Sequence, residues 1–396
     1  MNGAVLAINA GSSSLKVGLF DVAGPDPKPI LRGSVEDKAE APRLTLKGPD
    51  GEVLEDRLWH EGADHAEMLD ATLDWMERHH DVGPLAAVGH RVVHGGERFT
   101  GPVRLDDETV TAIEALISLA PLHQPRSLEA IHALRKLRPS LLQVACFDTA
   151  FHRTMTPPAT RYAIPRRFER EGVRKYGFHG LSYEYVAGRL AGIDPALPGK
   201  RTVVAHLGNG ASLCAMRHGR SLDTTMGFSA LDGLVMGTRP GALDPGVVLY
   251  LQREHGMNAE AVERMLYHGS GLLGVSEISG DMRALVGSDD PRAKEAIELF
   301  AFRVARETAA LANTLEGIEA VIFTGGIGEH SSGVRAAICG CLKWLGLDLD
   351  VEANALRSAL ISRRSSRVVA RVVATDEEVV IARHVRAALG CNDGTA

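Results

Sequence analysis

The first residues that could do chemistry lie in a turn rich in glycine and serine near the start of the chain. Small residues from Asn9 to Ser14, Ser12 among them, let the backbone approach a ligand closely, and successive N–H groups in such a turn can bind an anion. Lys16 follows and could neutralise a phosphate. The segment lacks the G-x-x-x-x-G-K-[ST] pattern and leads into a strand-like stretch, which excludes a P-loop. An ordinary glycine/serine hairpin stays open as the alternative for this turn.

A second turn of the same type occurs half a chain later. The segment Ala7–Leu15 aligns with Ala205–Leu213 at an offset of 198 residues, half of the 396-residue length. In each segment an apolar strand leads into a turn of small polar residues and returns as a second strand. Few positions are identical, so chance similarity remains an alternative. Two such hairpins nevertheless favour a duplicated domain, with a nucleotide clamped in a cleft between the copies.

Two charged residues are attached to apolar runs. Arg91 interrupts the run Ala86–Val93, and a permanent cation within a strand is costly unless an anion pairs with it. Asp148 directly follows the run Leu141–Phe147. A carboxylate at the carboxyl end of a strand can hold Mg²⁺ or orient a nucleophile. An internal salt bridge for Arg91 and a loop cap for Asp148 remain the alternatives.

Histidines and arginines in loops form a further group of candidates. His179 precedes a helix that we expect Ser182 to cap, and an imidazole there can hydrogen-bond a transferring phosphoryl group. His123 is a second candidate of this kind. Arg239 lies in a loop too rich in Gly and Pro for a helix, and Arg283 comes two residues after Asp281. Structural histidines and solvated surface arginines are the alternatives.

Two candidate segments adjoin helices. We expect Phe323–His330 to leave a buried strand through a glycine-rich turn and to precede a helix that begins near Ser331 or Ser332. Glycines at such a place bring a strand end and a helix start close to a flat ligand or its phosphates. Glu377 opens the last helix, where the helix dipole alone would explain an acidic residue.

The elements that must position these residues alternate in the manner of an α/β protein. The clearest predicted strands are 5–8, 17–20, 86–93, 142–147, 202–207 and 320–323. The clearest predicted helices are 66–79, 107–119, 127–137, 292–315 and 377–389.

Composition sets the class of protein. A length of 396 residues favours two domains, and 45% hydrophobic with 24% charged residues exclude a disordered, fibrous or coiled-coil chain. The formal net charge of −6 argues against a nucleic-acid partner, and no run of 18 apolar residues predicts a membrane span. With no signal-peptide pattern at the start, we expect a cytoplasmic protein. The five cysteines are too scattered for a disulfide framework or a structural zinc site, so we expect reduced thiols.

Taken together and in order, these segments resemble the acetate and propionate kinase family over nearly the whole chain. The resemblance rests on eight strings, which are 9–16, 90–96, 147–152, 175–180, 206–212, 236–239, 326–329 and 375–378. It implies an α/β fold of two duplicated actin-like ATPase (ribonuclease H-like) domains around a nucleotide cleft. The expected N-terminal domain spans 1–150, carries the acyl substrate side and is completed by the helix 377–396; the nucleotide-binding domain spans 151–376.

The family's functional residues carry over to matching positions of this chain. The catalytic positions would be Arg91, Asp148, His179 and Arg239. The nucleotide positions would be Ser12, Ser14, Lys16, His206, Leu207, Gly208, Asn209, Gly210, Asp281, Met282, Arg283, Gly326, Ile327, Gly328, Glu329 and His330. The acyl substrate would contact Arg91, Val93, Leu122, His123 and Phe178, and the metal ion would be held by Asn9 and Glu377.

The activity implied by the resemblance is reversible phosphoryl transfer from ATP to acetate, giving acetyl phosphate and ADP. The implied ion is Mg²⁺, with Mn²⁺ as a substitute, and the implied assembly is a homodimer. A propionate- or butyrate-preferring kinase is the alternative within the family. Two other classes are an actin-fold ATPase that regulates a protein partner and a sugar kinase. The first would need an additional peptide-binding domain, and the second would need a polar substrate pocket.

Four positions depart from the family's usual pattern. His330 stands where Asn is usual, 240–243 differ from the usual Ser-Gly-Asp-Ile, and 181–183 differ from the usual Thr-Ser-His. Ala230 stands where a proline often helps to wall the acyl pocket. Because a smaller residue leaves room for another methylene, we expect appreciable use of propionate.

Overall fold

The chain divides into two compact α/β units. The computed structural model describes residues 3–11, 14–36, 42–60, 65–79 and 85–390. Unit 1 comprises Met1–Phe151 and Asp376–Ala396, and unit 2 comprises His152–Thr375. The division lies one residue from each expected domain boundary. The last helix therefore belongs to the unit formed by the start of the chain.

Unit 1 contains an eight-stranded sheet in the order β5-β4-β3-β2-β1-β6-β8-β7. Strands β1, β2 and β3 pair antiparallel as consecutive hairpins, whereas β1, β6 and β8 run parallel. The strands are β1 (Ala4–Ala10), β2 (Ser14–Asp21), β3 (Lys28–Glu36), β4 (Arg43–Lys47), β5 (Val53–Leu58), β6 (Leu85–Val92), β7 (Val103–Arg104) and β8 (Leu142–Phe147).

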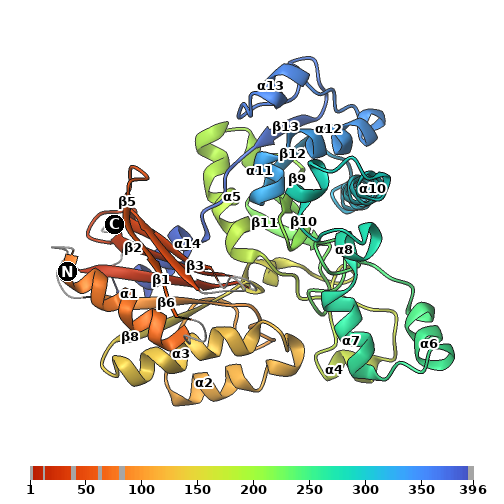
Figure 1. The fold of residues 1–396 in the computed structure, drawn as a ribbon. Coiled ribbons are helices and arrows are strands. Elements are labelled where there is room, and N and C mark those ends of the chain that lie inside the picture. Colours follow the sequence, from red (N-terminus) through yellow and green to blue (C-terminus); the bar gives the residue numbers. More distant parts are fainter. Residues whose placement is uncertain (1–2, 12–13, 37–41, 61–64, 80–84, 391–396) are drawn as a thin grey trace. The chain divides into compact units, whose positions relative to one another are not determined.

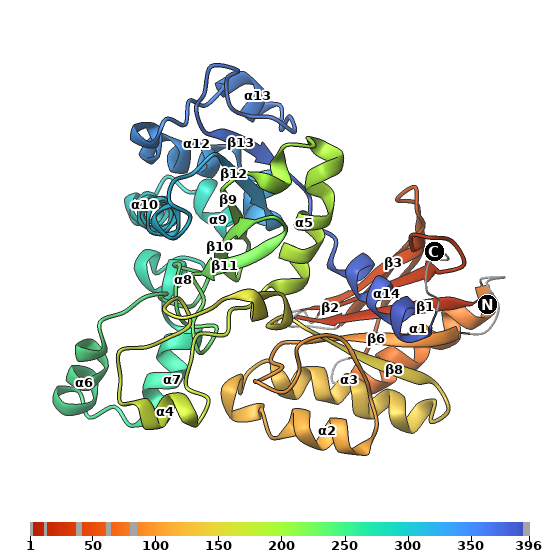
Figure 2. The same ribbon diagram turned by 180° about the vertical axis from the view of Figure 1, so that it is seen from behind.

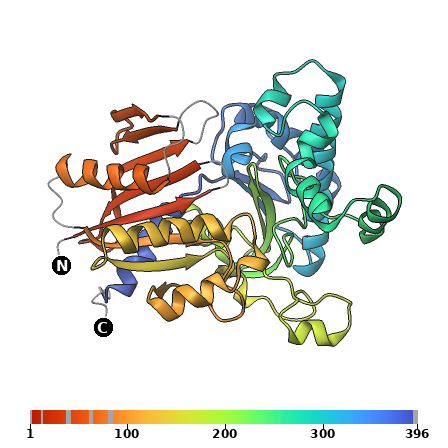
Figure 3. The same ribbon diagram turned by 60° about the horizontal axis from the view of Figure 1, so that its bottom comes forward.

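Helices cover both faces of this sheet. Helices α1 (His65–His79) and α3 (Gln124–Leu137) lie on one face and α14 (Glu377–Ala388) lies on the other, as the two opposite views show (Figures 1 and 2). Figure 3 shows α14 in blue beside the red N-terminal strands. Helix α2 (Asp107–Glu114) packs with α3.

The packing of unit 1 follows from strand periodicity and one glycine. Alternate side chains of β1, including Leu6 and Ile8, point to the α1 and α3 face and join its buried core. On the other face, a Cβ at Gly89 would lie 2.3 Å from the Cγ2 of Ile381 in α14. Only glycine therefore lets α14 pack this closely on β6.

Unit 2 repeats the topology of unit 1. Its five strands have the order β11-β10-β9-β12-β13, which matches β3-β2-β1-β6-β8 in both order and strand direction. The two hairpins singled out in the sequence are β1–β2 and β9–β10, and each occupies the same place in its sheet. The strands are β9 (Thr202–Leu207), β10 (Ala211–Arg217), β11 (Arg220–Thr224), β12 (Ala320–Thr324) and β13 (Val369–Val372).

Helices of unit 2 flank its sheet, with α5 and α10 on opposite faces (Figures 1 and 2). The Asp290 side chain caps α10 by accepting a hydrogen bond from the Arg292 N–H, and Pro291 occupies the first turn as expected. The helices are α4 (Arg166–Arg170), α5 (Gly180–Ile193), α6 (Pro245–Glu254), α7 (Ala259–His268), α8 (Gly271–Ser276), α9 (Met282–Val286), α10 (Pro291–Thr314), α11 (Gly325–His330), α12 (Ser332–Cys341) and α13 (Val351–Ala355).

All six predicted strands are present, but three local predictions are wrong. The helix expected over 107–119 ends at Glu114, and Ile117–Leu119 forms a separate 3₁₀ turn, because Leu116 turns in against Gly96. The glycine-rich turn after β12 is itself a short helix, α11, ahead of the predicted one. Ser182 does not cap α5, which begins earlier, at Gly180.

The structure describes four of the five cysteines and shows whether its helices could span a membrane. Among the described residues, no helix is long and apolar enough to cross a membrane. Cys146, Cys214 and Cys339 are buried free thiols, and Cys341 is an exposed one. Cys391 lies outside the described residues.

We predict that acid destabilises unit 2 through a buried histidine. His152 accepts a hydrogen bond at Nδ1 from Ser221 and donates one from Nε2 to the Phe178 carbonyl. Burial lowers the pKa of His152 from 6.5 to about 4, although the bond to Phe178 opposes this shift. The unfolded chain therefore binds a proton that the folded chain rejects. About 3 kcal/mol of stability, complete above pH 6.5, is lost as the pH falls towards 4.

The measurement is urea unfolding of wild type and His152→Gln at several pH values between 7.5 and 4.5. We expect the variant to be less stable at neutral pH but to lose less stability on acidification. Burial lowers the pKa of His90 in unit 1 to about 4 as well, so some pH dependence should remain. An identical pH slope in both proteins would contradict the prediction.

Candidate active site

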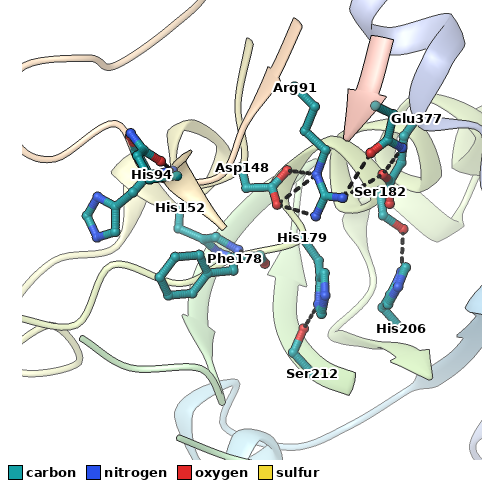
Figure 4. A network of polar contacts seen from close by, with 12 residues as sticks. Arg91, His94, Asp148, His152, Phe178, His179, Ser182, His206, Ser212 and Glu377 are labelled. Carbon is teal, nitrogen blue, oxygen red and sulfur yellow. Dashed lines mark hydrogen bonds and ion pairs between the residues drawn. The ribbon is translucent and has the colours of Figure 1, made fainter. Parts of the chain in front are cut away.

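Unit 1 holds a buried guanidinium–carboxylate pair. Arg91 in β6 donates from Nε to both carboxylate oxygens of Asp148, at 3.0 and 3.1 Å, and from Nη2 to Oδ2 at 2.6 Å (Figure 4). Asp148 directly follows β8, which runs parallel to β6. The Asp148 N–H donates a hydrogen bond to the Val92 carbonyl at 3.0 Å, which places the carboxylate beside Arg91. The Asp148 side chain is 1% exposed. The salt bridge that was left open as an alternative for Arg91 is therefore present.

Asn9 and the first turn of α14 complete this cluster. Arg91 Nη1 donates to Asn9 Oδ1 at 3.0 Å and lies 3.9 Å from Glu377 Oε2. Asn9 Nδ2 in turn donates to Glu377 at 2.9 Å and to Glu378 at 3.0 Å. Asp376 caps α14 by accepting from the Val379 N–H, so the cap fixes where both glutamates project. The structure thus brings together the predicted residues Asn9, Arg91, Asp148 and Glu377.

The charges of this cluster sum to a negative value. Burial alone would lower the pKa of Arg91, but the nearby carboxylates, Asp148 foremost, raise it instead, so the guanidinium stays charged. Burial and the charge of Glu377 raise the pKa of Glu378, and Lys16 opposes the shift. Arg32 pairs with Asp376 and lies 3.7 Å from Glu378. The cluster thus holds four carboxylates (Asp148, Asp376, Glu377 and Glu378) and three cations (Lys16, Arg32 and Arg91). Clustered carboxylate and amide oxygens are the donors that Mg²⁺ prefers, so the residues of this cluster fit such an ion.

A glutamine that the sequence interpretation missed holds the loop after β6. Gln124 is completely buried; its Oε1 accepts from the His94 N–H at 3.1 Å and its Nε2 donates to the His94 carbonyl at 3.0 Å. This pair of bonds ties the segment after Val93 to the start of α3, beside Leu122 and His123. Three of the four acyl-site residues predicted in unit 1, which are Val93, Leu122 and His123, therefore lie close to the two residues that these bonds join.

Unit 2 holds two stacked imidazole rings. His179 is the N-cap residue of α5 with φ 58° and ψ 26°, and its ring lies 4.3 Å from that of His206, at 22°. His179 Nδ1 is 2.8 Å from the Ser212 hydroxyl, and His206 Nδ1 is 2.8 Å from the Ser182 hydroxyl (Figure 4). Ser182, predicted as a helix cap, instead orients a ring.

Arg239 lies beside these rings. A Cβ at Gly210 would be 2.8 Å from Arg239 Nη2 and 3.2 Å from His179 Nε2, so only glycine leaves this space open. Arg239 Nη1 donates to the Ala230 carbonyl at 2.8 Å. In the part of the chain that the structure describes, no carboxylate lies within 4 Å of Arg239. Burial lowers its pKa to about 10, against a smaller effect of Tyr267, so it remains cationic at neutral pH.

The predicted nucleotide segments of unit 2 converge around the β9–β10 turn. The Gly237 N–H donates to the Asn209 carbonyl at 3.0 Å, and a Cβ at Gly237 would lie 2.9 Å from the Gly280 carbonyl, directly before Asp281. A Cβ at Gly325 would lie 2.8 Å from the Leu207 carbonyl, so α11 also begins at this turn. The predicted segments 281–283 and 326–330 thus each begin one residue after a glycine that contacts this turn or its neighbour Gly237.

Some of the residues in these segments stabilise the fold itself. Glu329 accepts hydrogen bonds from the N–H groups of Gly325, at 2.9 Å, and Thr375, at 3.1 Å, so its carboxylate holds the backbone around α11. Met282 is buried. Arg335, which the sequence interpretation missed, is completely buried and donates to the carbonyls of Gly328 and Glu329, at 2.9 Å each. This arginine therefore fixes the end of α11.

Three of the predicted residues belong to the first hairpin. Ser12 lies outside the described residues, and of Ser14 only the backbone, in β2, is described. Lys16 is exposed on β2, opposite Asn9. Phe178, the acyl-site residue of unit 2, is buried next to His179.

Comparisons with known proteins agree on one family. A model of the acetokinase family matches residues 4–383. An acetate kinase of Rhodopseudomonas palustris (strain TIE-1) is 51% identical over 391 residues, which cover 97% of this chain and 98% of the relative.

Solved structures give the same result. A propionate kinase from Francisella tularensis has a TM-score of 0.89 and 36% identity and covers 96% of this chain and 98% of its own. An acetate kinase from Porphyromonas gingivalis has a TM-score of 0.84 and 35% identity, over 98% of this chain and 100% of its own.

We predict that Arg91→Ala destabilises unit 1 strongly, because it leaves the buried Asp148 carboxylate without its partner. Removing one member of a buried ion pair costs about 3–5 kcal/mol. The matched control is Arg283→Ala, which breaks a pair with Asp281 whose arginine side chain is 91% exposed. That loss should stay below about 1 kcal/mol. Equal losses for both variants in urea unfolding would contradict the buried pair.

Proposed function

The chain belongs to the acetokinase family, whose members have the two-domain actin-like ATPase fold, and we propose that it transfers the γ-phosphoryl group of ATP to acetate reversibly. The observation that carries this proposal is the full-length family match. The two polar clusters described above supply the residues that such a reaction requires. Acetyl phosphate and ADP are the products.

The chemical difficulty of this reaction is electrostatic. A carboxylic acid such as acetate titrates near the ordinary value of about 4.3 for a glutamate, so at neutral pH it is already an anionic nucleophile. No base is needed to remove a proton from it. The acceptor must instead approach a γ-phosphate that is itself negative. Cations that bind the charge on the transferring group therefore provide most of the catalysis.

We assign the roles in unit 1 accordingly. Arg91 has five N–H donors, and its bonds to Asp148 and Asn9 use three of them, which leaves two for the acyl carboxylate. Asp148 acts by holding Arg91 and by positioning the acceptor rather than by abstracting a proton. Val93, Leu122 and His123 of this unit would contact the acyl substrate, and the family resemblance implies the same role for Phe178.

The roles in unit 2 follow from the positive charge of Arg239. Arg239 and His179 would bind the equatorial oxygens of the phosphoryl group during transfer, because both face the space above Gly210. The converging turns around Asn209 and Gly237 would bind the nucleotide. Lys16 of unit 1 would neutralise phosphate charge.

Mg²⁺ fits the negative cluster of unit 1, where Asn9 and Glu377 would hold it; when bound, the ion neutralises charge on the phosphate oxygens. To bind the ion, Asn9 would have to give up its hydrogen bond with Arg91 or with Glu377. Mn²⁺ could replace it. The homodimer and the cytoplasmic location remain predictions.

Trapping of the acyl phosphate with hydroxylamine tests the proposed function. The protein is incubated with ATP, Mg²⁺ and a series of short carboxylates, and the acyl hydroxamate is measured. We expect acetate-dependent hydroxamate together with ADP. ATP hydrolysis without hydroxamate would indicate a regulatory ATPase, and phosphorylation of sugars would indicate a sugar kinase; either would contradict the proposal.

We predict that Arg239→Ala lowers kcat by about 10³, in analogy with the loss of an arginine finger. The control is Arg306→Ala, which removes a surface arginine paired with the adjacent Glu307. Near-normal turnover of Arg239→Ala would show that the role assigned to Arg239 is wrong.

We also predict appreciable use of propionate. Ala230 is a small residue, 9% exposed, whose carbonyl is bonded to Arg239, and a methylene in an apolar pocket is worth only about 1–3 kcal/mol. The kcat/KM for propionate should therefore lie within about 200-fold of that for acetate. Ala230→Pro should widen the difference. A larger ratio in the wild type would contradict the prediction.

A further inference from the structure

Behind His179 lies a chain of buried hydroxyl groups with no role in the assignments above. The Tyr183 hydroxyl is 2.6 Å from the Ser212 hydroxyl, which is 2.8 Å from His179 Nδ1. Tyr183 and Ser212 are both 0% exposed. Tyr183 lies on α5 four residues after His179, and Ser212 lies on β10 opposite His206. Buried hydroxyl groups in such a chain must have defined hydrogen-bond directions.

The direction of the hydrogen bonds follows from donor counting. The backbone N–H of His206 lowers the pKa of Tyr183, as a donor to the phenol oxygen would. Burial raises the pKa of Tyr183 well above 10, so the phenol keeps its hydrogen at any working pH. Either oxygen of the 2.6 Å contact between Tyr183 and Ser212 can donate, and we assign the donor role to Tyr183. The serine has a single hydrogen, which then goes to His179 Nδ1.

A ring that accepts at Nδ1 carries its proton on Nε2 when it is neutral. Nε2 is the atom that faces the space above Gly210, beside Arg239 Nη2. The His206 ring stacked at 4.3 Å also favours a neutral partner, because two positive rings at that distance would repel each other. The ring can therefore donate to a negative phosphoryl oxygen without first being protonated.

We infer that Tyr183 and Ser212 are positioning residues that hold the His179 ring with its proton on Nε2. This inference rests on the role proposed for His179 in phosphoryl transfer. The hydroxyl chain would have the same function as a residue that fixes the tautomer of a catalytic imidazole. Replacing such a residue lowers kcat strongly even when the geometry of the site is kept.

The test is ¹H–¹⁵N NMR of histidine-labelled protein, in which long-range correlations distinguish the two tautomers. The His179 signal is identified by its loss in His179→Gln. We expect Nε2 to be protonated in the wild type and the Nδ1-protonated form to appear in Ser212→Ala and in the nearly isosteric Tyr183→Phe. Tyr176→Phe, which removes another buried phenol hydroxyl, bonded to the Gly172 carbonyl at 2.8 Å, is the matched control.

Kinetics provide a second readout. We expect kcat to fall about 10- to 100-fold in Ser212→Ala, and less in Tyr183→Phe, while KM for ATP and acetate changes less than twofold. A wild-type ring protonated on Nδ1, or a tautomer that neither variant changes, would overturn the inference. A changed tautomer with unchanged kcat would instead contradict the role proposed for His179 and leave the hydroxyl chain in place.

Discussion

The pair between Arg91 and Asp148 is the interaction on which unit 1 depends. Two parallel strands, β6 and β8, bring a cation and a carboxylate together where water is largely excluded. Such charges are tolerated only when each is paired and hydrogen-bonded, so the pair fixes the fork of Arg91 in one orientation. Asn9 then takes its own orientation from Arg91 and donates to both glutamates at the start of α14, whose positions the Asp376 cap fixes.

The two clusters have opposite charge. The unit 1 cluster contains more carboxylates than cations. In the described part of unit 2, the Arg239 guanidinium donates to the Ala230 carbonyl and has no carboxylate partner. A negative cluster suits a divalent ion, and a positive one suits phosphoryl oxygens. The charges of the two clusters thus agree with the proposed binding of Mg²⁺ in unit 1 and of phosphoryl oxygens in unit 2.

The sequence was sufficient for the α/β class, for six strands of the two sheets and for most members of each cluster. Strand periodicity and the two small-residue hairpins predicted the sheets, and residues at strand ends, such as Asp148, could be placed because parallel strands end together. Side-chain partners supplied by distant segments could not be predicted. Ser182 has the sequence context of a helix cap, yet its partner His206 lies 24 residues away.

Other residues were missed for related reasons. Tyr183 could have been considered because it lies in the first turn of the helix whose N-cap residue is His179. Ser212 could be linked to His179 only once β10 had been placed against α5. Arg335 and Gln124 bond mainly to backbone groups, which leave no pattern of residue types to recognise.

The central claim is that fixed positive charge lets one anion attack another. Chemical rescue tests it most directly: turnover of Arg239→Ala is measured with increasing guanidinium ion at concentrations that leave the protein folded. The account predicts a saturable rise in kcat with guanidinium and none with urea, which has a similar shape but no charge. A variant whose turnover stays unchanged by guanidinium, or rises equally with urea, would contradict it.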